Sequence, residues 1–182
     1  MALLEVETKI KVGDHALLKR RLGELGAVFR AAVTQRDRYY CSPLRDFAQT
    51  DEALRLRIEN GSATVTYKGP KRPSPVGKAR KEVSVAISSG EEFEEILTYL
   101  GFLPVAEVKK RREEFEWRGA EISLDTVEDL GQFVEIEVLC EDGQEQAEKV
   151  IDSIKDALRL SGPHIPESYL ELILARQKGA RS

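Results

Sequence analysis

The feature that most constrains the fold is a strict alternation of charged and apolar residues that recurs along the chain. Residues 3–12 (LLEVETKIKV) place Glu5, Glu7, Lys9 and Lys11 at every second position, with apolar residues or threonine between them. Because a β-strand sends successive side chains to opposite faces, this pattern predicts a strand with one charged face and one mainly apolar face. Any fold for this chain has to accommodate such a charged face.

The same parity holds in later segments, so the charged face belongs to a whole sheet and not to one strand. The charged residues that share one strand face in these segments are Arg55, Arg57, Lys68, Arg80, Glu82, Lys110, Arg112, Asp125, Glu135 and Glu137. Aliphatic and aromatic residues occupy most of the intervening positions. The pattern therefore indicates a sheet with a charged side and an apolar side that needs cover.

The chain as a whole reads as strands alternating with helices, with strands in the majority. We expect strands at residues 2–12, 34–41, 53–59, 62–68, 80–88 and 132–140, a hairpin formed by 108–119 and 120–127, and helices at 14–26, 90–101, 144–161 and 167–177. Asn60-Gly61 between two alternating runs predicts a tight hairpin turn. We expect a single domain over residues 1–176, followed by a disordered tail at 177–182.

Two arrangements of such a sheet are open. The first is an ordinary antiparallel sheet whose charged face is solvated. The second is a closed barrel whose charged face lines the interior. Blocks of one sign, such as Arg55-x-Arg57 and Glu135-x-Glu137, favour the barrel, because like charges on adjacent same-face positions repel each other. A charged interior makes sense if it binds a polyphosphate with divalent cations, since arginine and lysine suit phosphate and carboxylates suit Mg²⁺ or Mn²⁺.

Composition and isolated motifs exclude several other functions. A net charge of −4 over 182 residues provides no basic surface for nucleic acid or for a membrane, and no apolar run is long enough to span a bilayer. Cys41 and Cys140 lack metal-ligand spacing and are typical of reduced thiols, so we expect a cytoplasmic protein. His15 and His164 have no partners at ligand spacing, and no Ser-His-Asp or Cys-His set suggests covalent catalysis.

The segment 69–79 (GPKRPSPVGKA) contains Gly-Lys without the spacing of a phosphate-binding loop. Its three prolines argue against a central strand. We therefore expect a solvated connection, or alternatively a mobile basic flap over the mouth of a barrel.

Taken in order, these residues resemble the CYTH superfamily of triphosphate tunnel metalloenzymes. EVETK at residues 5–9 matches the family's N-terminal ExExK signature, and the charged pairs listed above follow in the family's order. The segments 35–40, 101–115, 124–138 and 168–172 look most like the class IV adenylate cyclase branch. The resemblance implies an α+β fold: a closed antiparallel β-barrel of about eight strands around a charged tunnel, with helices packed outside.

The resemblance also implies roles for the charged residues. Those implied to bind phosphate are Lys9, Arg55, Arg57, Lys68, Arg80, Lys110 and Arg112, and among them Lys9, Arg57, Lys110 and Arg112 are implied to act in catalysis. Those implied to hold or orient Mg²⁺ or Mn²⁺ are Glu5, Glu7, Glu82, Asp125, Glu135 and Glu137. Lys78 is an alternative to Arg80, because the preceding loop varies in the family.

Three functions stay open at this point. The first is conversion of ATP to cyclic AMP and pyrophosphate, as in class IV adenylate cyclases. The second is hydrolysis of inorganic, nucleoside or thiamine triphosphate, which would use the same residues. The third is triphosphate binding without catalysis. In each case the partner is a small triphosphate, and the protein is expected to be a monomer or a homodimer.

Overall fold

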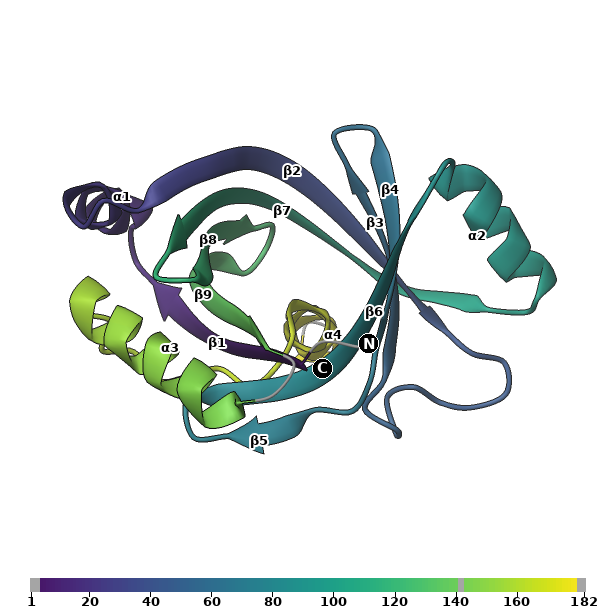
Figure 1. Ribbon diagram of the computed structural model, residues 1–182. Coiled ribbons are helices and arrows are strands. Elements are labelled where there is room, and N and C mark those ends of the chain that lie inside the picture. The colour runs from purple at the N-terminus through teal and green to yellow at the C-terminus, as the bar shows by residue number, and fades with distance from the viewer. Residues whose placement is uncertain (1–3, 141–142, 180–182) are drawn as a thin grey trace.

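The computed structural model describes residues 4–140 and 143–179, which form one nine-stranded antiparallel sheet and four helices (Figure 1). The strands are β1 (Leu4–Val12), β2 (Val28–Cys41), β3 (Ala53–Glu59), β4 (Ser62–Lys68), β5 (Arg72–Ser74), β6 (Gly77–Ile87), β7 (Leu103–Trp117), β8 (Ala120–Val127) and β9 (Gly131–Cys140). The helices are α1 (His15–Glu24), α2 (Gly90–Tyr99), α3 (Gln144–Leu158) and α4 (Tyr169–Gly179). None of these helices combines the length and the apolar character needed to cross a membrane.

The sheet closes into a barrel. Its strand order is β1-β9-β8-β7-β2-β3-β4-β6-β5, and an additional pairing of β1 with β6 joins the two sides. In that pairing Leu4 lies opposite Lys81, and Glu7 lies opposite Lys78. β5 is left as a short extra strand on β6. The closed antiparallel barrel of eight strands that was expected from the sequence is therefore confirmed.

Three helices cover the apolar outside of the barrel, as expected. α1 and α3 pack on the outward residues of β1, β8 and β9, where Ile122, Ile136 and Ile151 are fully buried. α2 packs on β3 and β4 through Leu97. The parity of the strands explains this arrangement, because the side chains that face away from the charged side are the aliphatic ones.

The fourth helix departs from the expectation that all helices lie outside. Figure 1 shows α4 nearly end-on, within the outline of the barrel. Tyr169 and Ile173 of α4 are buried against Val108, Val127 and Phe133. These three partners lie on the charged parity of their strands but are apolar, so this end of the interior needs an apolar plug, and α4 supplies it.

Several strands are longer than the sequence indicated. β2 begins at Val28 instead of residue 34, and β7 begins at Leu103 instead of residue 108. The segment 69–79 is not wholly a loop, because β5 occupies part of it and β6 already begins at Gly77. Pro73 is tolerated in β5 because this is an edge strand of three residues. α4 extends through Gly179, and residues 180–182 of the expected tail lie outside the described residues.

Closure of the barrel depends on a close approach at Gly77. A Cβ atom at this position would lie 1.9 Å from the backbone oxygen of Glu7 in β1. No rearrangement of a side chain relieves such a contact, because both partners are backbone. β6 can therefore reach β1 only with glycine at this position.

We expect Gly77→Ala to lower the free energy of unfolding by about 1–3 kcal/mol or more, because overpacking displaces the β1–β6 pairing. Gly23→Ala is the matched control: it lies in α1 with nothing within 4 Å of an added Cβ. Alanine in a helix is favoured over glycine by about 0.5–1 kcal/mol, so this variant should be neutral or more stable. Urea unfolding of both variants measures the difference, and equal stability of Gly77→Ala and wild type would contradict the close approach.

Candidate active site: a charged cavity inside the barrel

The inward strand faces line a cavity of about 940 Å³. Its wall carries eight cationic side chains, Lys9, Arg55, Arg57, Lys68, Lys78, Arg80, Lys110 and Arg112. It also carries nine acidic ones, Glu5, Glu7, Asp37, Glu59, Glu82, Glu114, Glu121, Glu135 and Glu137. Every site residue predicted from the sequence lies on this wall except Asp125, so strand parity placed them correctly inside the barrel.

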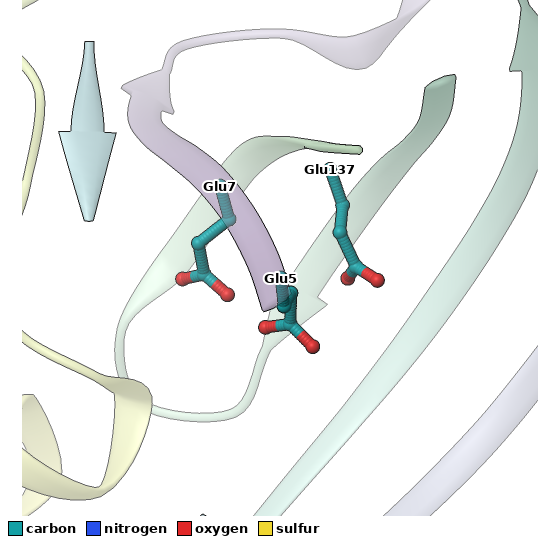
Figure 2. Close-up of side chains that lie close together, drawn as sticks. All are labelled: Glu5, Glu7 and Glu137. Carbon is teal, nitrogen blue, oxygen red and sulfur yellow. The ribbon is translucent and has the colours of Figure 1, made fainter. Parts of the chain in front are cut away.

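Three carboxylates meet on one side of the cavity. Glu5 and Glu7 of β1 and Glu137 of β9 each offer an oxygen, and these oxygens lie within 4.8 Å of one another (Figure 2). The sheet register produces the cluster, because Glu7 lies directly opposite Glu137. An all-carboxylate set at this spacing is the donor chemistry that suits a hard divalent cation such as Mg²⁺ or Mn²⁺.

The protonation of the three carboxyls differs because their neighbours differ. Burial, and then Glu7 and Glu121, raise the pKa of Glu137 to about 7. Burial also raises the pKa of Glu5 well above its usual value, although Lys68 opposes the shift. Burial alone would raise the pKa of Glu7 too, but Lys78 and Lys9 hold it well below its usual value. A divalent cation would stabilise all three in the charged form, which the protein alone does not.

The other predicted metal-binding acids are engaged by cations of the protein. Glu82 accepts a hydrogen bond from Lys68, and Glu135 accepts one from Arg112 and lies 3.5 Å from Lys9 Nζ. These acids therefore balance charge next to the three-carboxylate cluster and are not part of it.

Asp125 lies behind the cavity wall. Its side chain is fully buried, and it accepts two hydrogen bonds from Arg112, at 2.7 and 2.6 Å, and one from Lys110 at 3.3 Å. Burial would raise the pKa of Asp125, but Arg112 and Lys110 hold it well below its usual value. In this arrangement Asp125 fixes the direction of the Arg112 guanidinium.

Asp37 on β2 holds Arg57 in the way that Asp125 holds Arg112, and the sequence analysis missed it. It accepts two hydrogen bonds of 2.7 Å from Arg57, and its carboxylate lies 3.7 Å from Arg55. Burial would raise its pKa, but Arg55 and Arg57 hold it well below its usual value. The signal was present, since Gln35, Asp37 and Tyr39 alternate along the extended segment 34–41, to which we had assigned no inward face.

The predicted phosphate-binding position at Arg80 and its alternative at Lys78 both face the cavity. Lys78 Nζ lies 2.8 Å from Glu7, beside the carboxylate cluster. Arg80 instead donates from Nε to the carbonyl of Gly69 at 2.8 Å, and from Nη2 to that of Asp51 at 3.1 Å. Arg80 therefore anchors the start of the 69–79 segment to the barrel wall.

Tyr169 of α4 forms the floor of the cavity and was also missed. The ammonium groups of Lys9 and Lys110 lie 4.4 and 5.0 Å from the centre of its ring, and its hydroxyl donates to Asp125 at 3.0 Å. Burial, and then Arg112, lower the pKa of Lys110 to about 8. The plug helix thus helps to position two of the predicted phosphate-binding lysines.

Neither histidine lies on the cavity wall. His15 Nε2 is 2.9 Å from the carbonyl oxygen of Phe133, and His164 Nδ1 is 3.4 Å from the Thr8 hydroxyl.

The raised pKa of Glu137 predicts a pH dependence of stability in the absence of metal. The usual value is near 4.5 and the folded value about 7, so the folded protein holds this proton more tightly than the unfolded chain. The resulting stabilisation is complete below pH 4.5 and is lost as the pH rises through about 7. In EDTA, we expect the melting temperature to fall between about pH 5 and about pH 8. Glu137→Gln should show a smaller fall, and an equal fall in both proteins would contradict this assignment.

Comparisons with known proteins agree with this geometry. The CYTH domain model matches residues 3–169. A protein of Methanocaldococcus jannaschii named "Putative adenylate cyclase" is 40% identical over 174 residues, which cover 93% of this chain and 98% of that protein. The structure of the Pyrococcus horikoshii protein PH1819 has a TM-score of 0.82 and 37% identity, covering 94% of this chain and 99% of that one.

A more distant structure shares the fold alone. A Hippeastrum protein, described as a "Putative adenylyl cyclase" that reveals a dominant triphosphatase activity, has a TM-score of 0.68 at 15% identity, covering 97% of this chain and 96% of that one. The family match spans most of the chain and includes all the strands that build the charged cavity. The chain therefore belongs to the CYTH domain family.

Proposed function

We propose that this protein is a metal-dependent phosphoryl-transfer enzyme that binds a triphosphate inside the barrel and converts ATP to cyclic AMP and pyrophosphate. The observation that carries the proposal is the cluster of Glu5, Glu7 and Glu137 on the wall of a cavity that is otherwise rich in lysine and arginine. Carboxylates to hold a divalent cation and cations to hold phosphate are the two things that phosphoryl transfer requires.

The charge of the cavity supports a metal-dependent mode of binding. With eight cations and nine acids on its wall, the cavity has no net positive charge for a polyanion. Burial raises the pKa values of Glu5 and Glu137, and neighbouring carboxylates raise them further, so the cations of the protein do not fully compensate these two groups. A triphosphate that arrives with divalent cations brings the positive charge that this wall lacks.

The protein's own side chains position and stabilise the phosphates. Arg55, Lys68 and Lys9 reach the cavity from different strands and would hold the phosphate chain along the barrel. Arg57 and Arg112 are each clamped by a buried aspartate, so their guanidinium groups are held in place before the ligand arrives. Such preorganised donors stabilise the charge that develops in the transition state.

In the proposed reaction the ribose 3′-hydroxyl attacks the α-phosphorus and pyrophosphate leaves. Mg²⁺ or Mn²⁺ at the three carboxylates would supply a Lewis acid that lowers the pKa of the attacking hydroxyl. Lys110 and Arg112, next to each other on the inward face of β7, would stabilise charge on the reacting phosphate. No covalent intermediate is needed, which agrees with the absence of a histidine or cysteine from the described cavity wall.

A triphosphatase is the second candidate. The same residues would serve it, with water attacking the terminal phosphorus in place of the ribose hydroxyl. The Hippeastrum protein, which shares the fold, is described as having a dominant triphosphatase activity. The name of the M. jannaschii relative, at much higher identity, favours the cyclase. A binding module without catalysis fits less well, because all three clustered carboxylates are in place.

The products distinguish the two enzymes. Incubated with ATP and Mg²⁺ or Mn²⁺, a cyclase releases cyclic AMP and pyrophosphate in equal amounts, whereas a triphosphatase releases orthophosphate. We expect cyclic AMP from ATP, no products in EDTA, and slow release of orthophosphate from inorganic triphosphate. Orthophosphate as the main product from both substrates, without cyclic AMP, would establish the triphosphatase instead.

Arg55→Ala tests the phosphate role of the inward face without leaving a buried charge unpaired. Asp37 keeps its two hydrogen bonds to Arg57 when Arg55 is removed, so the fold should persist. Loss of one charge-assisted contact should weaken triphosphate binding by about tenfold or more, as measured by calorimetry with Mg²⁺. Arg111→Ala is the control, because Arg111 is exposed on the outer face of β7 and should bind triphosphate as the wild type does. An equal loss in both variants would contradict the assignment of the interior.

A further inference from the structure

Two side chains of the cavity wall each have a buried polar atom without a hydrogen-bond partner. These atoms are Oε1 of Gln35 and Nε of Arg55. The one other such atom among the described residues, Nε2 of His164, does not belong to the cavity wall. Leaving a buried polar atom unpaired is unfavourable, so each of the two identifies a contact that a ligand would complete.

The orientation of the Gln35 amide follows from its neighbour. Gln35 lies on β2 with 1% of its surface exposed, and its Nε2 donates to the carboxylate of Glu59 at 2.5 Å. The reverse orientation would bring two oxygens together at this distance. The amide carbonyl is therefore the unpaired atom, and it can only accept a hydrogen bond.

Arg55 presents the opposite requirement. Its Nη2 donates to Thr66 at 3.3 Å and its Nη1 lies 3.7 Å from Asp37, which leaves Nε as a free donor. A phosphate oxygen satisfies such a donor. Among the described residues, the cavity wall thus has one hydrogen-bond donor and one hydrogen-bond acceptor that lack partners in the protein.

An ionised inorganic triphosphate offers acceptors only, so it can complete Arg55 but not Gln35. The ligand that completes both carries phosphate and also a hydroxyl or amino group. In the register of β2 with β3, Gln35 lies opposite Glu59 and Tyr39 lies opposite Arg55. This offset of four residues separates Gln35 from Arg55 by about 13 Å along the wall. The ligand group that donates to Gln35 therefore lies well away from the phosphate oxygen that Arg55 binds.

The neighbours of Gln35 narrow the kind of donor. Gln35 is directly across from Lys110 on β7, and one inward-facing position along β2 from Asp37, which holds Arg57. Both Lys110 and Arg57 are cations of the cavity wall that we expect to bind phosphate. The group at Gln35 is therefore adjacent to a phosphate, and in a nucleotide the donors nearest to the phosphate are the hydroxyls of the sugar, not the groups of the base.

We propose that Gln35 accepts a hydrogen bond from a sugar hydroxyl of a bound nucleoside triphosphate, and so selects nucleotides over inorganic triphosphate. The proposal rests on the proposed function, since it assumes that the cavity binds a triphosphate. It makes Gln35 a specificity-determining residue, because the carboxylates beside it are already engaged: Asp37 accepts from Arg57, and Glu59 accepts from Gln35 itself.

The test compares Gln35→Met with the wild type, because methionine keeps the length of the side chain and removes the acceptor. Binding is measured by calorimetry with Mg²⁺ for four methylene-bridged probes that do not turn over: analogues of ATP, 2′-deoxy-ATP, 3′-deoxy-ATP and inorganic triphosphate. Thr34→Val is the matched control, since Thr34 is the neighbouring residue on β2 and is exposed on the outer face. Thermal unfolding of both variants without ligand confirms that each is folded, and Gln35→Asn replaces Gln35→Met if the latter is not.

We expect the wild type to bind the ATP analogue about tenfold or more tighter than one of the two deoxy analogues, the one that lacks the contacting hydroxyl. Gln35→Met should abolish this difference in affinity and leave the affinity for the inorganic analogue within about twofold of the wild type. Thr34→Val should change neither the difference between the sugars nor the affinity for the inorganic analogue.

If Gln35→Met lowered the affinity for all four probes equally, the proposal would be overturned, because Gln35 would then support phosphate binding in general and not recognition of the sugar. Unchanged binding of every probe would overturn it as well. If the wild type bound the inorganic analogue but did not distinguish the sugars, only the role of Gln35 would be wrong. If the wild type bound none of the four, the proposed function would fail, and the role of Gln35 with it.

Discussion

Taking a charged side chain out of water costs several kcal/mol unless a charge of opposite sign compensates it, and this barrel surrounds one cavity with eight cations and nine acids. The rest of the structure depends on how those charges are paired. Asp37 and Asp125 are the two centres of the pairing: each is buried and each clamps an arginine with two hydrogen bonds. Without them the strong mutual repulsion of Arg55, Arg57, Lys110 and Arg112 would oppose closure of the barrel.

Compensation is incomplete at the candidate metal site. Lys78, Lys9, Lys68 and Arg112 oppose the charge of Glu5, Glu7 and Glu137, but two of these three carboxyls still have raised pKa values. A cluster that is unfavourable in the protein alone becomes favourable when a divalent cation binds. Departures from good local pairing are expected where a protein binds its ligand, because binding makes up the stability that folding leaves out.

The plug helix links the apolar and the charged parts of the molecule. Through Tyr169, α4 closes one end of the barrel over Phe133 and at the same time contacts Lys9, Lys110 and Asp125. Lys71 of the 69–79 segment reaches α4 as well, with its ammonium 2.7 Å from Glu171. The floor of the cavity is therefore held by the C-terminal helix and by the segment that precedes β6, two parts of the chain that are far apart in sequence.

The sequence by itself determined which residues face inward and which face outward, because the alternation within each strand shows which residues share a face, independently of the other strands. It therefore predicted the charged wall and most of the site residues, whereas the blocks of one sign and the resemblance to the CYTH superfamily favoured a closed barrel over an open sheet. Only the tertiary structure decided which of them meet. The carboxylate cluster exists because the register of β1 and β9 places Glu7 opposite Glu137, and Gly77 allows β6 to close against β1. Tyr169 joined the site for the same reason, as did the pairing of Asp37 with Arg57: distances between residues remote in sequence are set by register, closure and packing, which no local pattern contains.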